Sequence, residues 1–196
     1  MLYLLLACQD VTEDTSISSP TELEKENKNT SHEEEEQNTI TELDSSQLPQ
    51  ASNPCKEPQL VRVNRIIDGD TIYVQMGTRE EKIRLIGINS PEIGYAGESS
   101  ECFAEEAQQY LESLVDGKQL WLTFDITCKD GYDRWLAYVH TGSEENEFVQ
   151  RDLLQSGYGF AYPFNDTPTY NSLFASDERE AMQNQAGGWG NCGWNQ

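Results

Sequence analysis

The stretch LVRVNRIIDGDTIYVQMGTREEKIRLIGINSPE, residues 60–92, carries the clearest structural pattern in the chain. Its apolar residues alternate over 60–67, 71–76 and 81–88, which is typical of half-buried β-strands. The two breaks, Asp68-Gly69-Asp70 and Gly77-Thr78-Arg79, are turn sequences. The stretch therefore predicts three consecutive antiparallel strands joined by tight turns.

The remainder of the globular part mixes helices and strands. A loop with two glycines is expected over 91–100, and strands are expected over 119–124 and 135–140. Three segments have helical spacing: 101–115, 148–157 and 170–186. Five strands and three helices indicate an α+β fold. A helix after the third strand is compatible with the five-stranded Greek-key barrel called the OB-fold.

Residues 9–58 differ sharply in composition from the C-terminal part of the chain. They are dense in Glu, Ser, Thr, Asn and Gln, include the acidic run Glu33-Glu34-Glu35-Glu36, and contain few large apolar residues. Such a segment buries too little apolar surface to offset its chain entropy, so a disordered acidic linker is expected. The globular domain is expected over 59–196.

The first eight residues, MLYLLLAC, form an apolar run that is too short to span a bilayer. They resemble the end of a bacterial signal peptide, and Leu5-Leu6-Ala7-Cys8 resembles a lipoprotein signal box in which Cys8 receives the lipid. No Lys or Arg precedes the run, and an apolar N-terminus without a targeting role is the alternative. We predict an exported protein, either a bacterial cell-envelope lipoprotein or extracellular, that is monomeric and touches membranes only through this anchor.

If the first cysteine carries lipid, four remain: Cys55, Cys102, Cys128 and Cys192. An even number in an exported chain predicts two disulfides, and the sequence leaves all three pairings open. Cys55 and Cys192 flank the globular part, so a bridge between them would close it end to end. A zinc site at Cys102, Cys128 and His140 is the alternative, but the chain has no CxxC or HxxxH spacing to support it.

The chain is strongly acidic, with 35 acidic and 13 basic residues and a formal net charge of −22. The part from residue 59 onward is acidic as well. This balance argues against a protein held on nucleic acid by a large basic surface. A nucleic acid would therefore have to be bound at a few positions rather than along a broad basic surface.

Four short pieces place charged residues at strand ends or in turns: 68–71 (DGDT), Arg84, 89–92 (NSPE) and 130–134 (DGYDR). Each alone has an ordinary explanation as a turn, a surface arginine, a helix start or a surface ion pair. Asp70 begins the second strand and Asn89 ends the third, so their oxygens are expected to converge on one hard cation. With Glu92 as a base and two arginines that bind phosphate oxygens, these groups can hydrolyse a phosphodiester.

Around these pieces the chain resembles the staphylococcal nuclease (thermonuclease) family, from about residue 62 to 189. The matching motifs, in the order typical of that family, are VNRIIDGDTIYV, IRLIGINSPE, CFAEEAQQYLESLV, DGYDRWLAYV, VQRDLLQSGYGFAY and GGWGNC. The resemblance implies an OB-fold barrel with three helices. It also implies a calcium-dependent endonuclease that acts on DNA and RNA.

The resemblance also assigns roles to individual residues. It implies that Asp70 is a calcium ligand, that Asn89 stands where the family usually has a second acidic ligand, and that the Ser90 carbonyl completes the protein's contribution. Asp68 would lie in the outer shell of the ion. Because Asn89 removes a charge, we predict weaker calcium binding and reduced activity.

The catalytic roles are implied in the same way. Glu92 would orient or deprotonate the attacking water, Arg84 would bind the phosphate, and Arg134 would stabilise the transition state and the leaving oxygen. Tyr132 and Tyr162 would line the nucleotide pocket. The alternative is a nuclease-like barrel that has lost catalysis and serves as a binding module at the cell surface.

Overall fold

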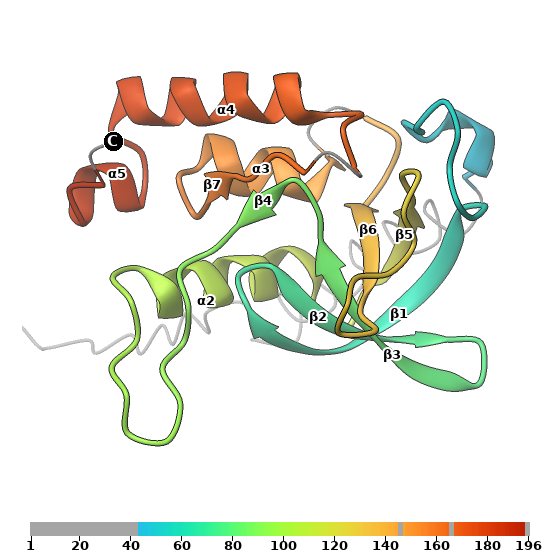
Figure 1. Ribbon diagram of the computed structural model, residues 1–196, viewed down its shortest axis with the longest axis horizontal. Coiled ribbons are helices and arrows are strands. Elements are labelled where there is room, and N and C mark those ends of the chain that lie inside the picture. Colours follow the sequence, from blue (N-terminus) through green and yellow to red (C-terminus); the bar gives the residue numbers. More distant parts are fainter. Residues whose placement is uncertain (1–42, 145–146, 165–166, 195–196) are drawn as a thin grey trace, which may run out of the picture. The chain divides into compact units, whose positions relative to one another are not determined.

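The computed structural model describes residues 43–144, 147–164 and 167–194 (Figure 1). A closed five-stranded barrel combined with helices confirms the predicted α+β class and OB-fold architecture. The signal-like residues 1–8 with Cys8, and most of the predicted linker 9–58, lie outside the described residues.

The barrel is built from five strands: β1 (Gln59–Asp68), β2 (Thr71–Met76), β3 (Arg79–Leu85), β5 (Gln119–Thr123) and β6 (Trp135–His140). Their order around the barrel is β1-β2-β3-β6-β5, and antiparallel pairing of β5 with β1 closes it. The β3 and β6 strands run parallel, with Arg84 opposite Leu136. This pairing brings the turn that precedes β6 next to the strand that carries Arg84.

The expected single strand over 81–88 is divided in the structure. After β3, the short β4 (Ile88–Asn89) leaves the barrel and pairs with β7 (Phe160–Ala161) in a separate two-stranded sheet. Gly87 at the break has a φ of 82°, and a Cβ atom there would lie 2.4 Å from the Phe174 ring. Glycine suits this turn on both counts. The chain therefore bends away from the barrel just before the NSPE segment.

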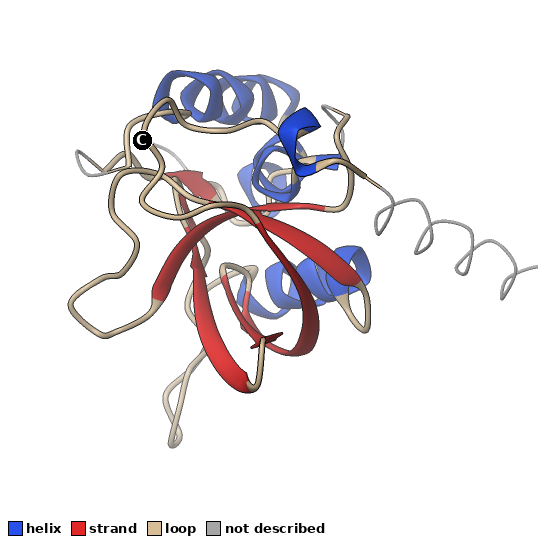
Figure 2. Cartoon of the chain, turned by 90° about the vertical axis from the view of Figure 1, so that its right-hand side faces the viewer, coloured by secondary structure: helices blue, strands red, loops and turns tan. Residues whose placement is uncertain are grey.

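The described residues contain four α-helices, one more than predicted: α2 (Ala104–Val115), α3 (Val149–Gln155), α4 (Asn171–Asn184) and α5 (Gly188–Asn191). The α2 helix packs against β1, while α3 packs against β6 and α4 (Figure 2). The α2 helix starts later than the predicted residue 101 because Phe103 has a left-handed backbone, with φ 74°. None of the described helices is long and apolar enough to cross a membrane.

The interior is filled by alternate residues of the barrel strands, among them Val63, Ile72, Val74, Ile83, Leu85, Leu120, Leu122 and Ala137. Outside the barrel, a buried ion pair joins α3 to α4. Arg151 donates through Nε and Nη2 to the two oxygens of Asp177, each at 2.8 Å, and Gln155 donates to the same carboxylate at 2.9 Å. These two helices are therefore joined by a paired charge as well as by apolar contacts.

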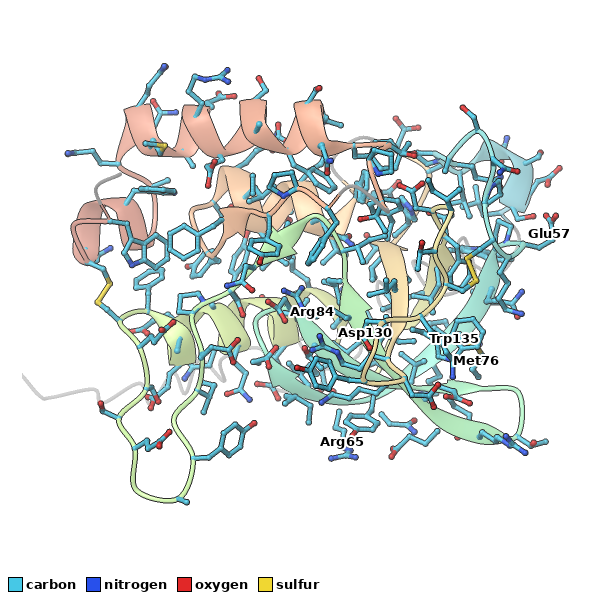
Figure 3. The ribbon with its side chains drawn as sticks, in the orientation of Figure 1. Glu57, Arg65, Met76, Arg84, Asp130 and Trp135 are labelled. Carbon is cyan, nitrogen blue, oxygen red and sulfur yellow. A yellow bond between two sulfur atoms is a disulfide. The ribbon has the colours of Figure 1, made fainter. Side chains whose placement is uncertain are left out.

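Two disulfides join Cys55 to Cys128 and Cys102 to Cys192 (Figure 3). The bridge between Cys55 and Cys192, one of the pairings that the sequence left open, is not formed. The Cys55 N–H donates to the Asp125 carbonyl at 2.8 Å, which places this cysteine near Cys128. Cys192 follows α5 and pairs with the cysteine just before α2. Since Cys102 and Cys128 are both oxidised, the zinc alternative is excluded.

Residues 43–58 fall within the range whose composition suggested a linker. They include a short 3-10 helix, η1 (Ser45–Gln47), and the apolar side chains of Leu48 and Ala51 are buried. Cys55 is tied to the barrel by its disulfide. The packed part of the chain therefore begins upstream of residue 59.

His140 lies in the core at the end of β6. Its Nε2 is 2.9 Å from Thr123 Oγ1, its Nδ1 has no hydrogen-bond partner among the described residues, and burial lowers its pKa to about 3. Below pH ~6.5 the unfolded chain protonates this ring whereas the native protein does not. The contribution of the neutral, buried His140 to the free energy of unfolding is therefore complete above that pH and is lost as the pH falls toward 3.

We expect the free energy of unfolding to fall more steeply in wild type than in His140→Gln between pH ~6.5 and ~4.5, by up to ~1.4 kcal/mol per pH unit. Urea denaturation followed by tryptophan fluorescence at several pH values measures both slopes. Parallel curves for the two proteins would show that His140 is not buried in its neutral form.

Candidate active site

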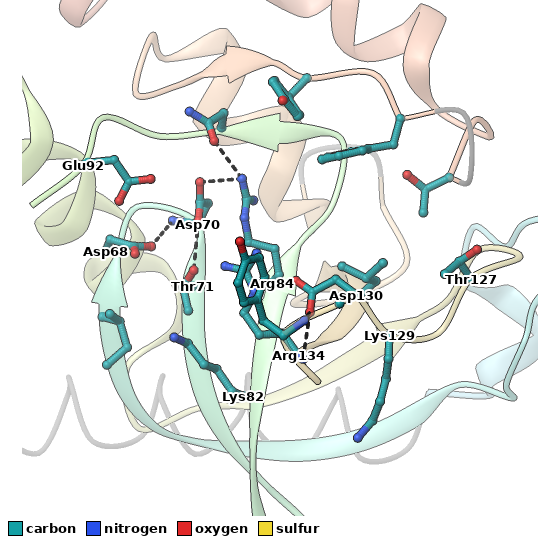
Figure 4. Close-up of a pocket in the computed structure, with 18 of the residues that line it drawn as sticks. Asp68, Asp70, Thr71, Lys82, Arg84, Glu92, Thr127, Lys129, Asp130 and Arg134 are labelled. Carbon is teal, nitrogen blue, oxygen red and sulfur yellow. Dashed lines mark hydrogen bonds and ion pairs between the residues drawn. The ribbon is translucent and has the colours of Figure 1, made fainter.

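A cavity of about 670 Å³ opens where the β1–β2 turn, the end of β3, the loop after β4 and the turn before β6 meet (Figure 4). All residues predicted to bind metal or substrate or to act in catalysis, except Ser90, line it: Asp68, Asp70, Arg84, Asn89, Glu92, Tyr132, Arg134 and Tyr162. The barrel topology thus brings together four pieces of sequence that are far apart along the chain.

Asp70 is buried at the centre of this arrangement. Its Oδ2 accepts the Ser90 N–H at 2.8 Å and lies 2.9 Å from Arg84 Nη2, while its Oδ1 accepts from the Thr71 hydroxyl at 3.0 Å. Gly69 permits this packing, because a Cβ atom there would lie 2.7 Å from the Ser90 Cβ. The Asp70 carboxylate is therefore held rigidly between the turn, β3 and the NSPE segment.

Asn89 and Ser90 lie directly against this carboxylate. Asn89 Oδ1 accepts from Arg84 Nη2 at 2.9 Å, so the Asn89 and Asp70 oxygens flank the same nitrogen. Ser90 is buried behind the cavity wall, and its carbonyl accepts from Asn89 Nδ2 at 3.3 Å. The oxygens of Asp70 and Asn89 that were predicted as metal ligands therefore converge on the Arg84 guanidinium.

Asp68 forms the outer edge of the same turn. Its Oδ1 accepts the Asp70 N–H at 3.0 Å. Burial, and then the negative charge of Asp70, raise the pKa of Asp68 to about 6. Two carboxylates at such close quarters form a site that a cation would stabilise.

Arg84 projects from the end of β3 and is largely buried. Besides Asp70 and Asn89, its guanidinium donates to the Leu85 carbonyl. Burial lowers its pKa, and the charge of Asp70 opposes that effect. An arginine remains charged at any physiological pH, so Arg84 presents a positive charge held at a defined position in the cavity.

Arg134 is held by its own turn. Asp130 accepts from Arg134 Nε at 2.6 Å and, through its other oxygen, from the backbone N–H groups of Arg134 and Tyr132. Burial raises the pKa of Asp130, but these hydrogen bonds outweigh it and the net shift is downward. Tyr132, 85% exposed, lies with its ring centroid 5.6 Å from the Arg134 guanidinium carbon. Asp130 is thus a supporting residue that the motif contained but sequence reasoning left without a role.

Glu92 lines the cavity from an exposed position, and its backbone is clasped by Glu101. The Glu92 N–H donates to the Glu101 carboxylate at 2.9 Å, and the Glu101 N–H donates to the Glu92 carbonyl at 3.0 Å. These two bonds close the base of the intervening loop. The position of the Glu92 backbone does not depend on the Glu92 side chain.

Exposed aromatic rings gather around the same opening. Tyr162 packs edge-on against Phe164 with centroids 4.7 Å apart, and Tyr95 lines the cavity from the loop that follows Glu92. Tyr95 and Phe164 were missed at the sequence level, because exposed aromatics in loops have no periodic signal. Together with Tyr132, these rings provide flat surfaces on which bases can stack.

The oxygen donors at the cavity are of the chemical type that a hard cation prefers. Asp68, Asp70 and Asn89 offer carboxylate and amide oxygens, and within residues 43–144, 147–164 and 167–194 no cysteine or histidine lines the cavity. Oxygen-only sites suit Ca²⁺ or Mg²⁺, whereas zinc prefers nitrogen and sulfur. Among the residues that the structure describes, no group of three or more His, Cys, Asp or Glu is arranged for a metal. Asn89 is part of the reason that no such group is present in the described part of the chain, because it supplies an amide oxygen where an acidic residue would supply a charged one.

Comparison with known proteins agrees with this geometry. The family model described as "Staphylococcal nuclease homologue" matches residues 82–191. A thermonuclease from Staphylococcus intermedius is 32% identical over 129 residues, which cover 65% of this chain and 74% of that protein. Endonuclease YncB from Bacillus subtilis (strain 168) is 31% identical over 136 residues, which cover 68% of this chain and 63% of that protein. The chain therefore belongs to the staphylococcal nuclease family.

Proposed function

We propose that this protein is a calcium-dependent endonuclease that hydrolyses phosphodiester bonds in DNA, RNA or both. The observation that carries the proposal is the single cavity in which Glu92, Asp70 and two arginines meet. A base, a cation site and two donors to phosphate oxygens are the groups that phosphodiester hydrolysis requires. The endonuclease and thermonuclease names of its relatives support the same chemistry.

In the proposed mechanism, Glu92 accepts a proton from the water that attacks phosphorus. Arg84 and Arg134 donate to the phosphate oxygens as negative charge builds up on them and on the leaving oxygen. Asp130 keeps the Arg134 fork in place through the 2.6 Å contact. Calcium, held by Asp70 and Asn89 with the Ser90 carbonyl and with Asp68 in its outer shell, would supply Lewis-acid stabilisation of the same charge.

The test is cleavage of heat-denatured DNA and of RNA at low salt by the full chain, folded under oxidising conditions, over a calcium titration with a chelator control. Asn89→Asp restores a charge beside Asp70, so we expect its half-saturating calcium concentration to fall by about tenfold, because affinity for the ion rises with the number of charged ligands. An unchanged or higher half-saturating concentration in Asn89→Asp would remove Asn89 from the metal site. Calcium-independent cleavage would contradict the calcium requirement itself.

An inactive binding module is the second candidate function. It would bind single-stranded nucleic acid through the exposed rings without cleaving it. We propose an exported protein in either case, because the two disulfides suit an oxidising compartment. Its monomeric state stays a prediction. Lipid attachment at Cys8, which lies outside the described residues, stays a prediction.

A further inference from the structure

Four cations from the described part of the chain line the cavity, and one of them has no counter-ion. Three ion pairs account for the others: Arg84–Asp70, Lys129–Asp133 and Arg134–Asp130. Among the described residues, the Lys82 ammonium makes neither a hydrogen bond nor an ion pair. It is therefore the cation of this cavity with the most capacity to bind an added anion.

Lys82 belongs to a row that crosses the outer face of the barrel. Tyr73 on β2 is the register partner of Lys82 on one side and of Arg65 on β1 on the other. The Tyr73 ring centroid is 3.7 Å from the Arg65 guanidinium carbon and 5.9 Å from the Lys82 nitrogen. Figure 3 shows Arg65 projecting away from the barrel, below Arg84. The ring thus positions two cations next to each other, leading away from the cavity.

The spacing along β3 suits a nucleic-acid strand. Lys82 and Arg84 are two residues apart on one strand, so they share a face and their Cα atoms are separated by roughly 6.6 Å. This repeat is comparable with the separation of consecutive phosphates in an extended strand. If one phosphate lies at Arg84, the next along the strand can reach Lys82.

Charge decides the direction in which a strand can leave the cavity. Residues 92–117, which include the loop after β4 and α2, contain seven acidic residues and no lysine or arginine. Residues 62–84, which form β1 to β3, contain five basic and four acidic residues. Figure 1 shows the loop after β4 and the β2–β3 turn on opposite sides of the barrel. A polyanion is repelled by the first region and accepted by the second.

We propose that Lys82, and beyond it Arg65, bind successive phosphates of a single nucleic-acid strand whose scissile phosphate lies at Arg84. The inference rests on the proposed function and adds the path of the substrate. Glu80 does not block it, because its 3.2 Å ion pair with Arg65 is about half exposed and such pairs contribute little. A phosphate that approaches Arg65 can replace this contact.

The test compares two substrates of the full, disulfide-bonded chain: a short single-stranded oligonucleotide, and a nucleoside para-nitrophenyl phosphodiester with one phosphate. The variants are Lys82→Gln, the double variant Lys82→Gln with Arg65→Gln, and Arg179→Gln as a control. Arg179 is exposed on α4, so the control makes the same change in net charge away from the cavity. Each kcat/KM is measured over a range of salt concentrations.

For Lys82→Gln we expect the ratio of kcat/KM between the oligonucleotide and the one-phosphate substrate to fall about two- to fivefold, the effect of one partly exposed ion pair. The slope of log kcat/KM against log salt on the oligonucleotide becomes shallower by about 0.7 for each lost contact, and further in the double variant. Arg179→Gln keeps the wild-type ratio. Equal losses of kcat/KM on both substrates, or salt slopes that match those of the control, would overturn the proposal that Lys82 and Arg65 bind successive phosphates.

If the wild-type protein cleaves neither substrate, the proposed function is refuted. The proposed binding of successive phosphates by Lys82 and Arg65 is then tested by a binding measurement instead. Fluorescence anisotropy of the labelled oligonucleotide then compares wild type, Lys82→Gln and Arg179→Gln. A shallower salt dependence of oligonucleotide affinity in Lys82→Gln alone supports the proposal that Lys82 binds a phosphate of the strand. Identical binding by all three proteins overturns it.

Discussion

We expect Glu92→Gln to lose roughly 10²- to 10⁴-fold in kcat on single-stranded DNA and on RNA, the usual contribution of a general base. Glutamine has nearly the same size and keeps an oxygen in the cavity, but it cannot accept a proton from water. The backbone at this position is held by Glu101 through its N–H and carbonyl, so the loop stays in place. KM should change little, because Glu92 is not expected to bind the phosphate.

The matched control for this variant is Glu98→Gln. Glu98 is exposed on the same loop, does not line the cavity, and loses the same charge. Rates are measured at saturating calcium so that a weaker ion site does not imitate a lost base. Equal activity of Glu92→Gln and Glu98→Gln would mean that another group accepts the proton. If the wild-type protein binds oligonucleotides but cleaves none, the result would favour the binding-module function over the endonuclease function.

Replacing Arg151 by methionine should lower the free energy of unfolding by about 3–5 kcal/mol, because it leaves the buried Asp177 carboxylate without its paired charge. Gln155 still donates one hydrogen bond, but a neutral amide does not balance an anion in the interior. Urea denaturation at neutral pH, followed by circular dichroism, measures the loss. The cavity residues lie on other elements, so activity of the folded fraction should persist.

A second variant separates pairing from packing. Arg151→Met combined with Asp177→Leu removes both charges, so we expect it to recover most of the stability lost in Arg151→Met. Arg179→Gln on the exposed face of α4 should stay within about 0.5 kcal/mol of wild type. A loss below about 1 kcal/mol in Arg151→Met would show that the pair is hydrated in solution.

The barrel was predictable because its signals are local. Alternation over 60–76 and the two turn sequences are enough to specify the first hairpins. The division of the third strand was not, since Gly87 turns against Phe174, which is 87 positions later. The β7 strand was not predicted for a similar reason: its two residues form a strand only because they pair with β4. Cysteine pairing likewise depends on which distant segments pack together.

Much of the cavity could be predicted from the sequence because its residues sit at the ends of predicted strands. Asp70 and Asn89 lie close together although Asn89 is on β4, in the separate two-stranded sheet, and both side-chain oxygens contact Arg84 Nη2. The role of Lys82 could not be inferred, since its distinction is the absence of an ion pair among the described residues, a property of the folded surface. Asp130 was visible in its motif, but only the geometry shows that it braces Arg134.

The clasp between Glu92 and Glu101 has a consequence for how such a protein can diversify. Both hydrogen bonds lie at the base of the loop, so the residues at its tip contribute nothing to holding the Glu92 backbone. Surface loops tolerate insertions at small energetic cost, since lengthening a closed loop adds little entropy loss. The tip, which carries Tyr95, can therefore grow, shrink or change composition while the Glu92 backbone stays in place. Substrate choice and chemical competence can evolve separately in this fold.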